Sequence, residues 1–110
     1  MEQCDIAIVG AGMVGAATAC LLAAEGLSVR VIETRLPEPY APEQPLDLRV
    51  SAISQASVAL LTRAGAWQYL QQMRLCPYRR LETWELAGFA TRFDAVDLGL
   101  PQLGYIIENR

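Results

Sequence analysis

The sequence contains no histidine, and every one of its nine basic residues is arginine. The lack of histidine excludes a Ser-His-Asp triad, a Cys-His dyad and any histidine-ligated metal site within the chain. The three cysteines are widely separated and form no C-x-x-C pair, so we expect neither a disulfide framework nor a metal site. A net charge of −3 disfavours a nucleic-acid partner. Cysteine usage favours a reducing, cytoplasmic compartment.

Apolar residues, in contrast, are abundant. They make up 53% of the 110 residues, against 19% charged, which favours a packed interior over disorder. The uncharged run from Ile6 to Ala24 is long enough in principle to span a bilayer. Its upstream flank is acidic and three glycines interrupt it, so we expect neither a signal peptide nor a membrane helix there.

The start of the chain has the pattern strand, glycine turn, helix, strand. Residues 5–9 form a short β-branched run, typical of a strand that is buried on both faces. Residues 12–25 are good helix formers, and Gly26 follows where a helix ends. Residues 28–33 return to strand character. Two parallel strands joined by a helix form a βαβ unit, so we predict an α/β fold that is Rossmann-like.

A Pro-rich loop and two further helices are expected next. Four prolines within residues 34–48 exclude a regular helix or a central strand, so this segment is predicted to be an irregular, mobile loop. Helical spacing of apolar residues predicts helices over residues 54–64 and 66–73.

The last third of the chain is predicted to be rich in strands. After Pro77, apolar and polar residues alternate over 81–86, which predicts a strand. A turn at Gly88 leads to its expected partner strand over 89–93, and residues 104–108 are a further strand candidate. We therefore place a domain boundary between residues 1–76 and 77–110. The cysteines, Trp67 and Trp84 are expected to pack in the core rather than to contact a ligand.

The most informative residues are 10–15, Gly-Ala-Gly-Met-Val-Gly, a G-x-G-x-x-G motif between a predicted strand and a predicted helix. Gly10 permits the tight turn, Gly12 lets a pyrophosphate approach the backbone, and Gly15 allows close packing. The helix N-terminus offers free N–H groups to the phosphates. Glu33 ends the second strand, where a carboxylate would bind ribose hydroxyls and repel a 2′-phosphate. These features predict a dinucleotide site and leave FAD and NAD open.

Residues 5–33 resemble the N-terminal FAD-binding unit of the para-hydroxybenzoate hydroxylase-like flavoprotein monooxygenases. Residues 48–54, 77–85 and 103–109 are similar to the ubiquinone-biosynthesis hydroxylases within that family. The resemblance implies FAD as the cofactor, NAD(P)H as the reductant and hydroxylation of a polyprenyl benzoquinol ring with O₂. Other ubiquinone-biosynthesis proteins are implied partners, and peripheral association with the inner membrane is an alternative to a purely cytoplasmic location.

The resemblance also implies which residues contact FAD. The turn would contribute the backbone of Gly10, Gly12, Met13, Val14 and Gly15. Glu33 would bind the adenosine ribose with Thr34 beside it, and Arg49 would approach the FAD phosphate and ribityl region. The alternative for Arg49 is a solvated or helix-capping arginine. No catalytic residue is assigned to the chain.

The family's later flavin-contacting motifs are absent, so the chain resembles an N-terminal fragment. Residues 1–76 would begin the FAD-binding domain, and residues 77–110 would begin a β-rich substrate region. We expect such a fragment to be inactive alone, to hold FAD weakly at most and to self-associate through exposed sheet edges. Two other interpretations stay open, an NAD-binding dehydrogenase fragment and a non-catalytic interaction module.

Overall fold

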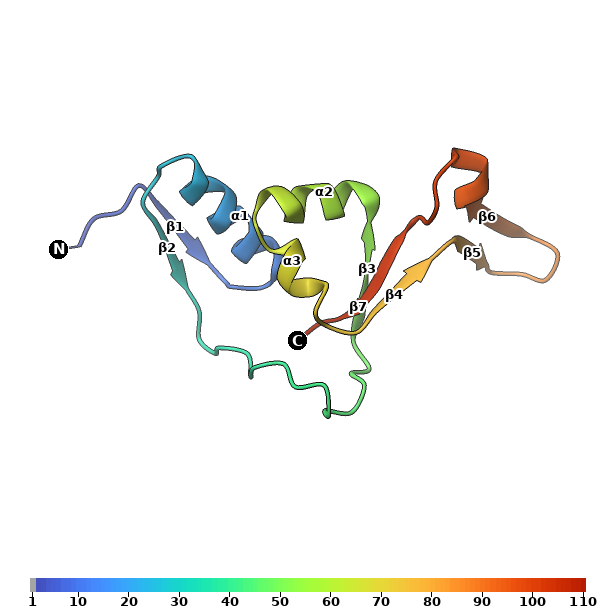
Figure 1. Ribbon diagram of the computed structural model, residues 1–110, viewed down its shortest axis with the longest axis horizontal. Helices are drawn as coiled ribbons and strands as arrows, with labels where there is room; N and C mark the ends of the chain where they lie inside the picture. The colour runs from blue at the N-terminus through green and yellow to red at the C-terminus, as the bar shows by residue number, and fades with distance from the viewer. Residues whose placement is uncertain (1) are drawn as a thin grey trace.

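Three small sheets follow one another along an elongated molecule in the computed structural model, which describes residues 2–110 (Figure 1). The elements in chain order are β1 (Ile6–Val9), α1 (Met13–Ala24), β2 (Val29–Ile32), β3 (Val50–Ser54), α2 (Gln55–Arg63), α3 (Trp67–Leu70), β4 (Leu75–Tyr78), β5 (Arg80–Trp84), β6 (Ala90–Asp94), the 3₁₀ helix η1 (Ala95–Leu98) and β7 (Gly104–Glu108). The predicted mixed α/β class is confirmed. The radius of gyration is 17.3 Å, above the ~13 Å of a compact domain of about this length.

The first sheet is a parallel pair of β1 and β2, with α1 connecting them. Asp5 and Ser28 join the two strands where they begin, because the Ser28 N–H and hydroxyl donate to the Asp5 carboxylate at 2.8 and 2.9 Å. These bonds, the backbone one foremost, hold the pKa of Asp5 below its usual value. At the end of α1, Gly26 adopts a φ of +86° and donates to the Ala23 carbonyl.

The second sheet is antiparallel, with β7 in the centre between β3 and β4. Helices α2 and α3 pack beside it, and Ser54 caps α2 by accepting from the N–H of Ser57. The small core lies here and consists of Ile53, Trp67 and Ile107. The Trp67 ring centroid is 5.2 Å from that of Tyr105. The prediction that Trp67 is a core residue is confirmed.

The sequence predicts no strand at β3 or β4, and both are present. Each pairs with β7, which is distant in sequence, so local pattern carries little of the signal. Pro77 has no N–H to donate, and β4 tolerates it because β4 is an edge strand. Strand β4 also spans the boundary proposed between residues 76 and 77, so its sheet joins both sides. That division stays a prediction.

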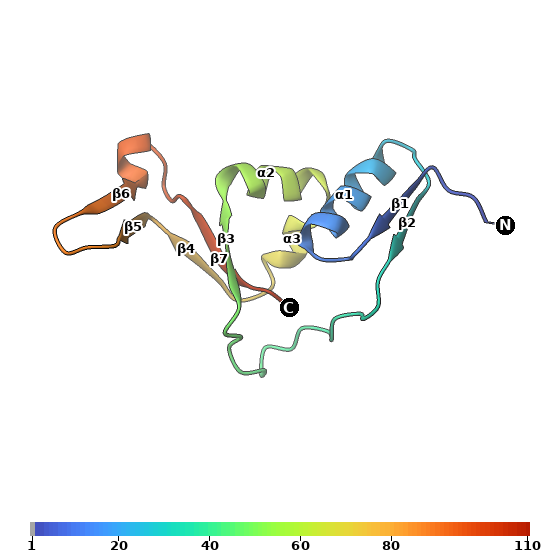
Figure 2. The ribbon, with the colours of Figure 1, turned by 180° about the vertical axis from the view of Figure 1, so that it is seen from behind.

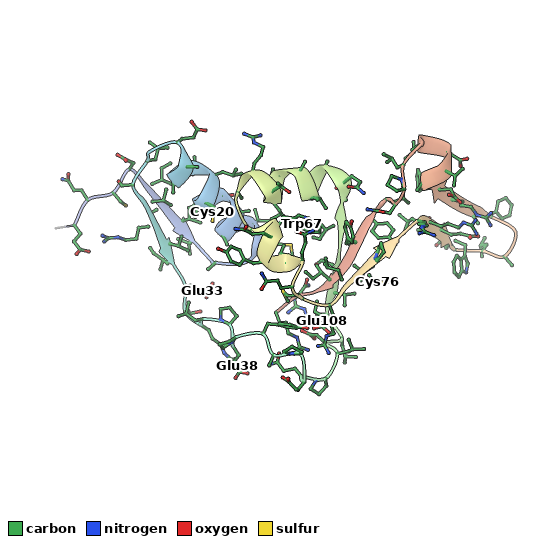
Figure 3. All side chains as sticks on the ribbon, in the orientation of Figure 1. Cys20, Glu33, Glu38, Trp67, Cys76 and Glu108 are labelled. Carbon is green, nitrogen blue, oxygen red and sulfur yellow. The ribbon has the colours of Figure 1, made fainter. Side chains whose placement is uncertain are left out.

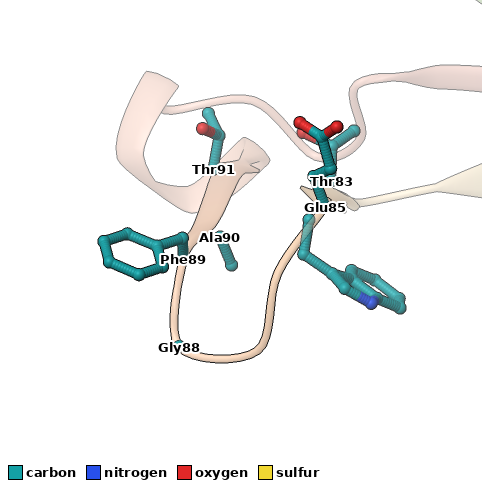
Figure 4. Close-up of a pocket in the computed structure, with 7 residues that line it drawn as sticks. Thr83, Glu85, Gly88, Phe89, Ala90 and Thr91 are labelled. Carbon is teal, nitrogen blue, oxygen red and sulfur yellow. The ribbon is translucent and has the colours of Figure 1, made fainter.

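The third sheet is the β5–β6 hairpin, which projects from one end of the molecule (Figures 1 and 2). Trp84 is 70% exposed, so the prediction that it is a core residue is wrong. The reason is that β5 and β6 pair only with each other. At the hairpin tip, Phe89 extends outward beside a shallow open hollow (Figure 4). The cysteines are likewise exposed rather than packed, because the described residues enclose so small a core.

The Pro-rich segment between β2 and β3 contains no helix or strand. Its second half is joined to the rest of the chain by side-chain hydrogen bonds, and its mobility stays a prediction. Arg74 donates to the Gln44 carbonyl at 2.8 Å, and Arg110 donates to the Pro45 carbonyl at 2.7 Å. Arginine side chains thus supply the donors that this irregular backbone cannot find in a sheet. Within residues 2–110, no helix has both the length and the apolar character needed to cross a bilayer.

Candidate functional site

The glycine turn, residues 10–15, connects β1 to α1 at the end of the parallel sheet. Gly10 donates its N–H to the Ile32 carbonyl at 2.8 Å, which extends the pairing of β1 with β2 by one residue. Its φ of +97° is a conformation that L side chains rarely adopt. The fold itself therefore requires glycine at position 10, and the Gly10 amide is already used by the sheet.

The other two glycines differ in what surrounds them. A Cβ atom added at Gly15 would collide with the backbone carbonyl of Gly10, so glycine there is required by helix–strand packing. A Cβ atom added at Gly12 would meet nothing within 4 Å, and the φ of Gly12 is −65°, which any residue adopts. Neither a steric contact within residues 2–110 nor an unusual backbone angle requires glycine at position 12.

The N-terminus of α1 presents backbone donors to solvent. The first bond of this helix runs from the Ala16 N–H to the Gly12 carbonyl at 2.9 Å. The N–H groups of Gly12, Met13 and Val14 find no acceptor among residues 2–110. No side chain caps the helix, and its first turn contains no acidic residue. Three free amides and the positive end of a helix dipole therefore meet beside the open space at Gly12.

Glu33 lies where β2 ends and the Pro-rich segment begins (Figure 3). One carboxylate oxygen, Oε2, accepts the N–H of Ala11 in the glycine turn at 2.7 Å. The other, Oε1, accepts the N–H groups of Thr34 at 2.7 Å and Arg35 at 3.1 Å. These bonds, led by that from Ala11, lower the pKa of Glu33 to about 2. The carboxylate is therefore ionised at neutral pH and contacts the turn directly.

The oxygen that contacts the turn still has bonding capacity. A carboxylate oxygen accepts about two hydrogen bonds, and Oε2 receives one from the described residues, that from Ala11. Oε1 already receives two backbone donors and, at 3.2 Å, the Thr34 hydroxyl. Oε2 can thus accept one further donor, such as a hydroxyl of a ligand bound along the turn. Since the group carries a full negative charge, it would repel a phosphate placed there.

Two contributors to this site were not predicted from the sequence. Ala11 and Arg35 donate their backbone N–H groups to Glu33 and so fix its carboxylate. Because they act through the main chain, their residue types carry almost no signal. The position of Ala11 between two turn glycines, opposite the acid that ends the neighbouring strand, is the one feature that could have indicated it.

The structure brings together most of the predicted site, with one exception. The turn, Glu33 and Thr34 meet where β1 and β2 end, at the carboxyl ends of the two parallel strands. Arg49 precedes β3 and is exposed, and its side chain forms no hydrogen bond or ion pair with the turn or with any other residue between 2 and 110. Its backbone is well held, since Asn109 donates to its carbonyl at 3.0 Å. The role of Arg49 stays a prediction.

The chain matches one family model and is similar in sequence to several known proteins. A family model described as an FAD binding domain matches residues 3–97. The chain is 53% identical over 108 residues to 3-demethoxyubiquinol 3-hydroxylase from Escherichia coli (strain K12), covering 98% of this chain and 28% of that protein. It is 38% identical over 111 residues to "Ubiquinone biosynthesis monooxygenase COQ6, mitochondrial" of Xenopus tropicalis, covering 96% of this chain and 24% of that protein. The chain spans about a quarter of the length of these curated relatives.

Proposed function

We propose, since this chain belongs to the FAD binding domain family, that it forms the FAD-binding portion of a monooxygenase that hydroxylates a polyprenyl benzoquinol ring in ubiquinone biosynthesis. The names of its relatives, a demethoxyubiquinol hydroxylase and a ubiquinone biosynthesis monooxygenase, support this assignment. Residues 77–85 and 103–109 resemble one such enzyme in particular, 2-octaprenyl-3-methyl-6-methoxy-1,4-benzoquinol hydroxylase.

The observation that carries the proposal is the unexplained glycine at position 12. Gly10 is accounted for by its positive φ, and Gly15 by its contact with the Gly10 carbonyl. Gly12 has neither reason, and it stands in open space beside the free amides of α1. A ligand that must touch the backbone explains the missing side chain, and a diphosphate is the group that such amides bind.

These residues fit the diphosphate and adenosine ribose of FAD. The N–H groups of Gly12, Met13 and Val14 would donate to the pyrophosphate, while Gly10 and Gly15 shape the turn. Glu33 would accept a ribose hydroxyl on Oε2, with Thr34 beside it, and Arg49 would approach the phosphate and ribityl region. Bound FAD would supply the oxygen-transfer chemistry, and this chain would bind and orient it.

Several finer features belong to the same proposal. The β1–α1–β2 unit would be Rossmann-like, with the Pro-rich segment leading onward to Arg49. NAD(P)H, a polyprenyl quinol and other ubiquinone-biosynthesis proteins would be partners of the whole enzyme. The exposed apolar side chains of the β5–β6 hairpin support self-association of the isolated chain. Cytoplasmic location, with or without peripheral membrane association, stays a prediction.

Titration of the chain with FAD and, separately, with NAD tests the proposal. FAD is expected to bind and to quench or shift its own fluorescence, while NAD binds more weakly. Gly12→Val is expected to abolish FAD binding, because its side chain would fill the space where the diphosphate meets the amides. The Val side chain begins in open space, so the variant should keep the wild-type circular dichroism, with only the small loss of stability expected when valine replaces glycine at a helix N-cap.

The matched control is Ala64→Val, a small-to-branched change at the end of α2 and outside the proposed site. It should leave FAD affinity unchanged. Preference for NAD over FAD would support the dehydrogenase interpretation instead. A folded Gly12→Val variant with wild-type FAD affinity would show that the glycine turn is not the binding site.

A further inference from the structure

We propose that Glu108 is a positioning residue for FAD, which acts by fixing the backbone of Arg49 through the end of the Pro-rich segment. This inference rests on the proposed function, because it concerns how Arg49 is presented to FAD. Glu108 ends β7, the central strand of the antiparallel sheet, and its side chain is only 5% exposed. It is the one buried charged residue within residues 2–110, and the glycine turn does not involve it.

Two arginines surround the Glu108 carboxylate. Arg74 donates to Oε2 at 3.0 Å, and Arg110 Nε lies 3.1 Å from the same oxygen as an ion pair without hydrogen-bond alignment. Burial alone would raise the pKa of Glu108, but the Arg74 bond, a backbone N–H and both positive charges outweigh it and lower that pKa. The carboxylate is therefore a stable anion, and it holds both guanidinium groups at the end of the sheet.

The Glu108 cluster, defined as Arg74, Glu108 and Arg110, holds the Pro-rich segment to β7 (Figure 3). The two arginines donate to the carbonyls of Gln44 and Pro45. The second carboxylate oxygen of Glu108, Oε1, accepts the N–H of Asp47 at 3.2 Å. Backbone groups of Gln44, Pro45 and Asp47 thus bond to one buried anion and its two counter-ions.

The same contacts continue to Arg49. The Asp47 carboxylate accepts the N–H of Arg49 at 3.0 Å, and the Asn109 N–H donates to the Arg49 carbonyl at 3.0 Å. Both backbone groups of Arg49 are therefore fixed by residues that Glu108 contacts or adjoins. The Arg49 side chain has no polar partner within residues 2–110, so it is positioned by its backbone while its guanidinium stays available to a ligand. Loss of the Glu108 charge would release this arrangement.

A double-mutant cycle between Glu108→Gln and Arg49→Ala tests the inference, with the FAD dissociation constant as the readout. Arg49→Ala removes a charge-assisted contact and should weaken FAD binding about tenfold. Glu108→Gln should weaken it roughly fivefold, and the double variant should bind no more weakly than Arg49→Ala alone. A purely structural role for Glu108 would instead give effects that multiply, and that result would overturn the inference.

Because Glu108→Gln can also disturb folding, Asp47→Asn provides a second variant. It weakens the acceptor of the Arg49 N–H but leaves the ion pairs of Glu108 in place. Its smaller loss of FAD affinity, about threefold, should likewise disappear in the Arg49→Ala background. The matched control is Glu82→Gln, which removes the acid of the exposed Arg92 ion pair in the hairpin and should leave FAD affinity unchanged.

Amide hydrogen exchange without FAD gives an independent readout. Glu108→Gln should speed exchange at Asp47, Arg49 and Asn109, whereas Glu82→Gln should not. If Arg49→Ala leaves FAD affinity unchanged while Gly12→Val abolishes binding, the inference is overturned and the proposed function stands. If the wild-type chain binds NAD in preference to FAD, the proposed function itself fails, and the inference fails with it.

Discussion

The parallel β1–β2 unit and the antiparallel β3–β7–β4 sheet differ in burial and in whether their polar groups have hydrogen-bond partners. In the parallel unit, α1 buries no residue and begins with amides that have no acceptor within residues 2–110. In the antiparallel sheet, Ile53, Trp67 and Ile107 are buried, and even the buried Glu108 has partners for both carboxylate oxygens. The first region is open where a ligand would bind, and the second is closed and holds its own core.

The two anchored glutamates show the same contrast. Glu33 is exposed and receives only neutral donors, from backbone N–H groups and one hydroxyl. Glu108 is buried and receives two guanidinium groups, which neutralise it locally. A carboxylate held by neutral donors keeps an uncompensated negative charge that a ligand can contact. A carboxylate held by arginines is neutralised by their positive charges. The two glutamates thus differ in their partners: Glu33 is held by backbone and hydroxyl donors at the glycine turn, and Glu108 by the two arginines that also hold the Pro-rich segment.

The largest effect should come from removing the core of the antiparallel sheet. Trp67→Ala should lower the free energy of unfolding by about 3 kcal/mol, because the ring is buried against Tyr105. Trp84→Ala is the matched control, since Trp84 is 70% exposed, and it should change stability by no more than about 0.5 kcal/mol. Urea unfolding followed by circular dichroism measures both. Equal losses would show that the hairpin is packed in solution.

A second pair of variants compares two glycines of the turn. Gly15→Ala should destabilise the chain by about 2 kcal/mol, because its Cβ collides with the Gly10 carbonyl. Gly12→Ala should cost no more than about 1 kcal/mol, the loss expected when alanine replaces glycine at a helix N-cap, since its Cβ meets nothing within 4 Å. If Gly12→Ala proved as destabilising as Gly15→Ala, position 12 would have a structural explanation, and its value as a marker of the ligand would be lost.

The smallest expected effect concerns acid stability. The folded-state pKa of Glu33 is about 2, below its ordinary value of 4.5. The ionised carboxylate therefore stabilises the fold above pH 4.5, and this contribution is lost as the pH falls from 4.5 towards 2. Glu33→Gln should flatten the pH dependence of the unfolding temperature within that window.

Part of that dependence should persist in the variant, because the lowered pKa values of Asp5, Asp94 and Glu108 act in the same direction. The control is Glu38→Gln, which changes an exposed acid of the same loop and should retain the wild-type profile. An unchanged slope in Glu33→Gln would mean that the bonds from Ala11 and Arg35 do not persist in solution.

Local sequence pattern predicted the elements whose signals lie within them. The glycine turn, the apolar residues of α1, the alternating residues of β5 and the apolar run of β7 are patterns within the elements themselves. Strands β3 and β4 were missed because each is defined by pairing with β7, up to 58 residues away at the Val50–Glu108 pair. The exposure of Trp84 was missed for a related reason, since burial depends on what covers a strand rather than on the strand itself.

By itself, the sequence predicted a turn with three glycines, a helix after it and an acid at the end of the next strand. Only the tertiary structure decided why Gly10 and Gly15 must be glycine, that Glu33 contacts the turn through Ala11, and that the Pro-rich segment is held by Arg74 and Arg110. The physical reason is that backbone amides carry no residue identity. Which of them are paired and which remain free is settled by contacts between distant segments.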